Sequence, residues 1–330
     1  MMLRFILQRF IGMVITLFIV SILVFIIMQL PPGDFADRYA FRKFSGGSVN
    51  ITQQDIENIR KQLGLDKPQW QLYLDWIGGI VTRLDFGTSF AYQTPVIRII
   101  KKHLGYTLIL IFGSLLLVYL IAIPLGMLAA LKRGSFFDYF ISLTGYAGLA
   151  IPPFLFALIL LYFLSKYTDF SIGGFFSDQF RDAPWTWAKL LDLGKHLIVP
   201  LIVLTWPNIA LQAQTIRATM SDEINRPYVT AAIARGVPWW KLWLKYPLRL
   251  AINPVIGTIG FDVNRIFSDL PIVAIVLNLP ELGQFLINAY LDLDMYLAGA
   301  ILLILCFIIV FMNFVSDVLL ACLDPRIKLE

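Results

Sequence analysis

The chain has 330 residues, of which 58% are apolar and 15% are charged, whereas an ordinary soluble domain carries about 25% charged residues. The mean hydropathy of +0.74 argues against a water-soluble fold, so we expect an integral membrane protein surrounded by lipids. Nothing in this composition indicates a nucleic-acid partner.

Six windows of about 20 mainly apolar residues, the length that crosses a bilayer, predict six transmembrane helices. They are Phe10–Leu30, Tyr106–Leu131, Tyr139–Leu164, Leu197–Thr219, Ile252–Leu277 and Tyr296–Leu320. No small-residue cleavage site follows the first window, so we interpret residues 1–30 as a tail and a retained first span. The predicted fold class is an all-α integral membrane protein.

Residues 31–103 connect the first two spans and carry ten Lys or Arg residues, but long loops are exempt from the rule that basic loops stay cytoplasmic. We predict a small extracytoplasmic domain here. Thr52 and Asp55 resemble a capping box, Gly64 is placed to end that helix, and Trp70 to Val81 indicates a second helix. Two interpretations stay open: a solvated lid over the outer mouth, or a surface that docks a partner or guides substrate.

Residues 104–323 form the predicted core domain with the other five spans, and 324–330 form a tail. Short segments rich in Lys and Arg stay on the cytoplasmic side. Such segments lie at the N-terminus, after the second span, in the C-terminal tail and at 217–250, which alone holds six cations. Both termini are therefore predicted to be cytoplasmic.

The loop at 217–250 contains its own signals for two short helices. Pro227 suits a first helical turn, Gly236 suits a left-handed position after a helix, and Pro238 can open a second helix. On the first helix, Tyr228, Ala231, Ala232 and Arg235 share one face, where small side chains would let another protein approach the backbone closely. The alternative is an amphipathic helix on the membrane surface, which fits the Trp- and Lys-rich second helix well.

Three charged residues, Asp262, Arg265 and Asp269, lie inside the fifth predicted span, on one helical face and at a spacing that allows pairing. Charges in a span are costly against lipid, so this face should point into the bundle, a partner subunit or an aqueous pathway. A translocation pathway and a structural ion-pair cluster are both compatible with the pattern.

The chain lacks the G-x-x-x-x-G-K-[ST] loop that cradles ATP phosphates, and it lacks the H-E-x-x-H and G-x-S-x-G motifs of hydrolases. We expect no catalytic residue, no metal and no cofactor bound by this chain. An intramembrane hydrolase with Asp262 and Asp269 as its carboxylate pair is disfavoured, because Arg265 lies between them. A secondary transporter or channel is the other alternative, but it does not need a two-helix cytoplasmic loop.

The loop resembles the EAA loop of permeases in ATP-binding-cassette (ABC) importers, in the dipeptide, oligopeptide and nickel branch. Matching motifs extend along the chain: Pro32-Gly33-Asp34, Leu65-Asp66-Lys67-Pro68, Leu84-Asp85-Phe86-Gly87-Thr88-Ser89, Ile123-Pro124-Leu125-Gly126, Ile151-Pro152-Pro153-Phe154 and Leu323-Asp324-Pro325-Arg326. The chain departs from the branch at Ile233 and Tyr246, where Arg and His are usual, and at Ala274–Gly283, which lacks the usual Glu and first Gly.

The resemblance implies a permease in the inner membrane that works by alternating access. It also implies a second homologous permease, two ATPase subunits holding ATP and Mg²⁺, and an extracytoplasmic solute-binding protein. The residues it assigns to ATPase coupling are Tyr228, Thr230, Ala231, Ala232, Arg235, Gly236, Val237 and Trp240. Peptides are the cargo implied most often in this branch, with oligosaccharides, opines and nickel chelates as alternatives.

Overall fold

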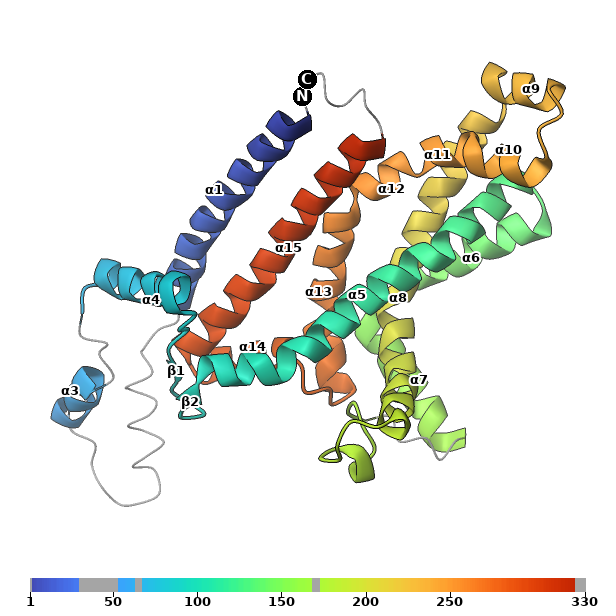
Figure 1. Cartoon of the computed structure of the whole chain (residues 1–330). Coiled ribbons are helices and arrows are strands. Elements are labelled where there is room, and N and C mark those ends of the chain that lie inside the picture. The colour runs from blue at the N-terminus through green and yellow to red at the C-terminus, as the bar shows by residue number, and fades with distance from the viewer. Residues whose placement is uncertain (1, 30–52, 63–66, 168–172, 324–330) are drawn as a thin grey trace. The chain divides into compact units, whose positions relative to one another are not determined.

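A computed structural model describes residues 2–29, 53–62, 67–167 and 173–323 (Figure 1). Its helices are α1 (Met2–Gln29), α3 (Gln53–Gln62), α4 (Gln69–Arg83), α5 (Val96–Leu131), α6 (Phe136–Ala150), α7 (Pro153–Tyr167), α8 (Trp187–Ile224), α9 (Pro227–Ala234), α10 (Trp239–Lys245), α11 (Pro247–Ala251), α12 (Asn253–Gly257), α13 (Ile259–Val276), α14 (Leu282–Leu291) and α15 (Met295–Leu323). A 3-10 turn (Asp178–Phe180) and a hairpin of β1 (Thr88–Ser89) and β2 (Thr94–Pro95) complete the elements.

Among the described residues, four helices, α1, α5, α8 and α15, are long and apolar enough to cross a membrane, and a fifth crossing results if α6 and α7 count as one span. The all-α membrane fold is therefore confirmed at this level. The predicted span Ile252–Leu277 corresponds to α12 and α13. The 18 residues of α13 include Asp262, Arg265 and Asp269, so length and composition alone do not identify it as a span.

The predicted span Tyr139–Leu164 is two helices, α6 and α7, bent by 103° at Ile151 and Pro152. Pro152 and Pro153 lack backbone N–H groups, and a residue before proline avoids the helical conformation; Ile151 is extended, with φ −93° and ψ 119°. Trp206 of α8 packs into the bend, donating from Nε1 to the Thr144 carbonyl at 3.1 Å. A Cβ on Gly148 would lie 2.3 Å from the Trp206 ring, so this contact requires glycine.

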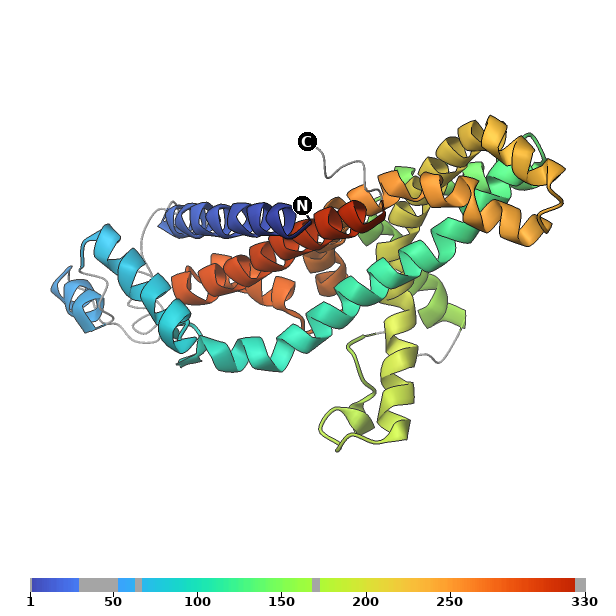
Figure 2. The same ribbon diagram turned by 45° about the horizontal axis from the view of Figure 1, so that its top comes forward.

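The contacts divide the chain into two compact units: unit 1 holds residues 1–11, 108–280 and 309–330, and unit 2 holds 12–107 and 281–308. Within unit 1, α8 packs against α6, α7, α11 and α13; Figure 2 shows α6 running along α8, as Figure 1 does. A core cluster of Ala130, Ile216, Met220, Leu248, Ala251 and Val255 joins α5, α8, α11 and α12. At the chain ends, Arg9 of α1 pairs with Asp317 of α15 at 3.2 Å.

Unit 2 contains the described part of the segment that was predicted to be an outer domain. The helix expected at Trp70–Val81 is α4, and α3 matches the other predicted helix, although Thr52 and Gly64 lie outside the described residues. The residues from 67 to 103 share this unit with 281–308. A separate extracytoplasmic domain at 31–103 stays a prediction.

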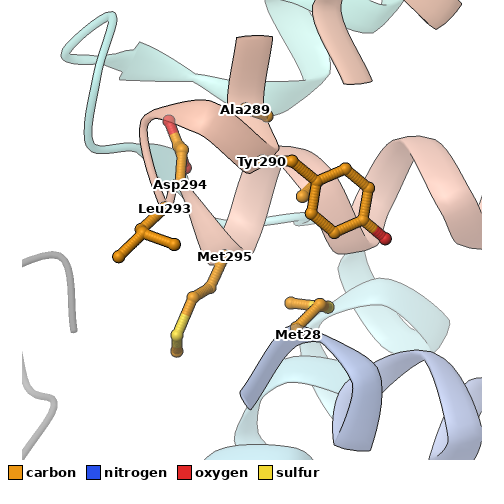
Figure 3. Close-up of a pocket in the computed structure, with 7 residues that line it drawn as sticks. Met28, Ala289, Tyr290, Leu293, Asp294 and Met295 are labelled. Atoms are coloured by element: carbon orange, nitrogen blue, oxygen red, sulfur yellow. The ribbon is translucent and has the colours of Figure 1, made fainter. Parts of the chain in front are cut away.

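Asp294, fully buried at the start of α15, holds the β1–β2 turn in place. Its carboxylate accepts hydrogen bonds from Ser89 Oγ at 2.5 Å and from the Ala91 N–H at 3.0 Å, and it also accepts from the Leu297 N–H. Ser89 belongs to one of the motifs that carry the resemblance. A pocket beside it is lined by Met28, Tyr290 and Met295, with Asp294 at its edge (Figure 3). Because this carboxylate is already hydrogen-bonded, the pocket offers mainly apolar surface.

Glu281 occupies the place where the resembled branch usually has the first glycine, and it is the N-cap of α14. Its fully buried carboxylate accepts from the Gly283 and Gln284 N–H groups at 2.7 and 2.8 Å and from Thr107 Oγ1 at 3.2 Å. The departure from the motif therefore has a structural role, because one side chain ties the start of α14 to α5.

Replacing Glu281 with alanine should lower the free energy of unfolding by about 1–3 kcal/mol, because buried N–H groups lose their acceptor. Burial raises the pKa of Glu281, although its hydrogen bonds oppose the rise. A folded-state pKa above the unfolded value means that stability falls as pH rises past the ordinary range of a glutamate. Denaturation of the purified chain at several pH values should show this fall, and Glu281→Gln should make it smaller.

Candidate functional site

In the loop that follows α8, proline and glycine residues mark the helix boundaries that were predicted. Pro227 occupies the first turn of α9, and Gly236 adopts a left-handed φ of +69° immediately after that helix. The Gly236 N–H donates to the Ile233 carbonyl and the Val237 N–H to the Ala232 carbonyl, which closes the helix end. Pro238 precedes α10 as its N-cap. Two short helices therefore meet at a glycine, as predicted.

The faces of α9 differ from the predicted arrangement. Val229 and Ala232 are fully buried against Leu242 of α10, so Ala232 packs within the loop itself. The exposed residues in and just after α9 are Pro227, Thr230, Ala231, Ile233, Ala234, Arg235 and Gly236, while Val237 is partly exposed and Trp240 is exposed. Small side chains still dominate the exposed face, but that face is centred on Ala231 and Ala234.

Tyr228 ties α9 to the end of α8. Its hydroxyl donates to Glu223 Oε2 at 2.6 Å, and burial together with this carboxylate raises the pKa of Tyr228 to about 12. The phenol therefore keeps its proton and remains a donor throughout the physiological pH range. This contact joins the first turn of α9 to the last turn of α8.

Asp138 and Arg217 form an ion pair nearby that sequence reasoning missed, in which the carboxylate is buried and the guanidinium is partly exposed. Arg217 of α8 donates from Nε and Nη2 to the two carboxylate oxygens of Asp138, which also accepts from the Gly134 N–H at 2.9 Å. The Asp138 side chain is 2% exposed and that of Arg217 is 28% exposed. The pair fixes the α5–α6 turn to α8 seven residues before α8 ends at Ile224. The sequence offered one local signal near this pair. Ser135 is the N-cap of α6, which places Asp138 in the first turn of that helix.

Within the described ranges, no ion pair joins the charged residues of α13, which are Asp262, Arg265 and Asp269. Asp262 is buried and accepts from Tyr119 of α5 at 2.6 Å and from Gln212 of α8 at 2.7 Å. Arg265 is exposed, and Asp269 is partly exposed. Asp262 therefore has its hydrogen-bond partners on α5 and α8 and not on its own helix.

The site is built from hydrogen bonds, an ion pair and packed helices. Within the parts of the chain that the structure describes, no group of three His, Cys, Asp or Glu side chains is placed to hold a metal ion.

Two family models match the chain. The model for binding-protein-dependent transport system inner membrane components matches residues 122–329, which include α8 to α15, and its N-terminal counterpart matches residues 2–111. The chain belongs to this family. It is therefore a multi-pass inner-membrane component of a binding-protein-dependent ABC transport system, and the site residues in α9, α10 and α13 all lie inside the longer match.

Full-length relatives support the assignment. The chain is 33% identical to the oligopeptide transport system permease protein AppB of Bacillus subtilis, over 99% of this chain and 100% of that protein. It is 30% identical to the dipeptide transport system permease protein DppB of Escherichia coli, over 99% of both chains. The similarity spans both units of this permease.

Proposed function

We propose that this permease forms half of the translocation pathway of an ABC importer for peptides. The observation that carries the proposal is the similarity over 99% of the chain to relatives whose names specify oligopeptide and dipeptide transport. The energy comes from partner ATPases, since the sequence lacks a P-loop, and the chain itself is not an enzyme. A second permease, two ATPase subunits and a solute-binding protein complete the proposed assembly.

The proposed topology has six spans: α1, α5, the bent pair α6–α7, α8, α13 and α15. The basic residues of the loop at 217–250 and of both chain ends support placing these segments in the cytoplasm. Residues 31–103 then lie outside. Charge inside α13 is compatible with a sixth span, because Asp262 is hydrogen-bonded inside the bundle while Arg265 and Asp269 face an aqueous pathway or the second permease.

In the proposed mechanism, the ATPase groove binds the small exposed face of α9 around Ala231 and Ala234. Movement of the ATPases reaches α8 through Tyr228 and Glu223, and it reaches α6 through Arg217 and Asp138. It reaches α13 through α11 and α12, because α11 packs on α8 and Thr219 Oγ1 donates to the Ala251 carbonyl at 3.3 Å. These contacts convert ATP binding into an exchange between inward-open and outward-open states.

The test is co-purification of the two ATPase subunits, followed by ATP-dependent uptake of peptides in proteoliposomes. Ala231→Trp places a large side chain on an exposed surface, so the permease should still elute as a monodisperse peak. It should lose ATPase binding by about tenfold or more, whereas Ala231→Ser should retain it. Ion-gradient-driven uptake by the permease alone would overturn the ATP-driven proposal. Uptake of oligosaccharides, opines or nickel chelates instead of peptides would overturn the assignment of peptides as the cargo.

A further inference from the structure

Helix α10 presents an amphipathic surface, of which only Trp240 is assigned to ATPase coupling by the family resemblance. Leu242 anchors its inner side, 4% exposed against Val229 and Ala232 of α9. On its outer side, Trp239 and Trp240 are 71% and 57% exposed. Leu244, Lys241 and Lys245 are also exposed on this seven-residue helix. The helix thus combines exposed indole rings with exposed ammonium groups.

The charge around α10 has one sign. From Asn225 to Phe261 the chain carries no Asp or Glu, while its five cations are Arg226, Arg235, Lys241, Lys245 and Arg249. A surface of this kind is complementary to anions. It also differs from the exposed face of α9, where Ala231 and Ala234 present small side chains, so the two helices suit different partners.

The first turn of α6 also exposes aromatic side chains, at the same end of α8 as α10. Phe136 and Tyr139 are 85% and 68% exposed there, and the ion pair of Asp138 with Arg217 fixes this turn to α8. From Arg217, α8 runs only seven more residues to Ile224 before the loop begins. Figure 1 shows the start of α6 and α10 at this one end of α8. Exposed aromatic rings at span ends are typical of the membrane–water interface.

We propose that α10 lies in the membrane–water interface and binds anionic phospholipid headgroups through Lys241 and Lys245. Trp239 and Trp240 then sit at headgroup depth, as interfacial aromatic residues do. The bilayer would hold α10 at a fixed depth. A displacement of α9 would then move α8 and α11 and would not tilt the loop at 217–250. This inference goes beyond the proposed transport function and does not depend on the cargo.

The experiment uses the full chain in nanodiscs with brominated phosphatidylglycerol or brominated phosphatidylcholine as fluorescence quenchers. The emission lost in Trp239→Phe/Trp240→Phe isolates these two residues from the other six tryptophans. We expect both lipids to quench this component, with a clear preference for phosphatidylglycerol. Equal quenching by the two lipids overturns the anionic site. If neither lipid quenches Trp239 and Trp240, and these rings are shielded only when ATPase subunits are added, the proposal is overturned in favour of a protein partner.

Charge reversal tests the role of the lysines with a matched control. Lys241→Glu/Lys245→Glu should reduce the preference for phosphatidylglycerol at Trp239 and Trp240 by roughly 30-fold or more, the effect expected for two cations at a lipid surface. Lys101→Glu/Lys102→Glu makes the same change in net charge at exposed positions of α5 and should leave this local preference unchanged. An equal loss in both variants, or a loss in neither, contradicts the assignment.

Discussion

Arg217→Met is expected to lower the free energy of unfolding by about 1–3 kcal/mol, because it leaves the buried carboxylate of Asp138 without its partly exposed cation. Coupled transport should fall as well, since the α5–α6 turn is no longer fixed to the end of α8. Denaturant titration of the purified permease and ATP-dependent uptake in proteoliposomes measure the two effects.

Two further variants separate the ion pair from a general loss of an arginine. Arg181 pairs with Asp178 in an exposed setting, with side chains 68% and 96% exposed, so Arg181→Met should cost less than about 1 kcal/mol. Asp138→Asn combined with Arg217→Met should recover part of the stability lost in Arg217→Met, because no buried charge is then left unpaired. Simple additivity of the two single losses would show that the side chains do not interact.

Gly126→Ala should destabilise the permease by about 1–3 kcal/mol, because the added methyl group overpacks the contact between α5 and α8. A Cβ at this position would lie 2.6 Å from the Ala213 carbonyl oxygen and 2.8 Å from Ile216 Cβ. Backbone and a β-branched side chain cannot move aside easily. The close helix contact thus accounts for the glycine of the Ile123–Gly126 motif.

Gly105→Ala is the matched control in the same helix. A Cβ at Gly105 meets nothing within 4 Å, so alanine there should be neutral or stabilise α5 by about 0.5–1 kcal/mol through its higher helix propensity. Thermal unfolding of both variants in the same detergent compares them directly. Equal stability of Gly126→Ala and Gly105→Ala would contradict the close approach of α5 and α8.

Local signals predicted the two short helices after α8. Pro227, Gly236 and Pro238 act through their own backbone constraints, so their positions were sufficient to place α9 and α10. The same local signals did not specify which side of α9 is exposed. Ala232 lies on the predicted face by helical spacing, but contact with Leu242, ten residues along the chain, buries it.

The length of the apolar windows predicted most of the membrane-crossing segments. It did not predict where such a segment is broken into two helices. Ile151, Pro152 and Pro153 lie within an apolar window, and hydropathy is insensitive to the missing N–H groups that separate α6 from α7. Similarly, the helical spacing of Asp262, Arg265 and Asp269 indicated a shared face. The spacing could not show that Tyr119 and Gln212, 143 and 50 residues away, would bind Asp262 alone.

The sequence by itself determined the family, the membrane setting and the two-helix loop between Tyr228 and Tyr246, because composition, short motifs and proline and glycine positions act locally. The tertiary structure alone decided the pairing of Arg217 with Asp138, the burial of Ala232 and the capping role of Glu281. Those features depend on side chains that are far apart along the chain and meet only when the helices pack. A hydrogen bond between distant residues leaves no periodic signal in the sequence.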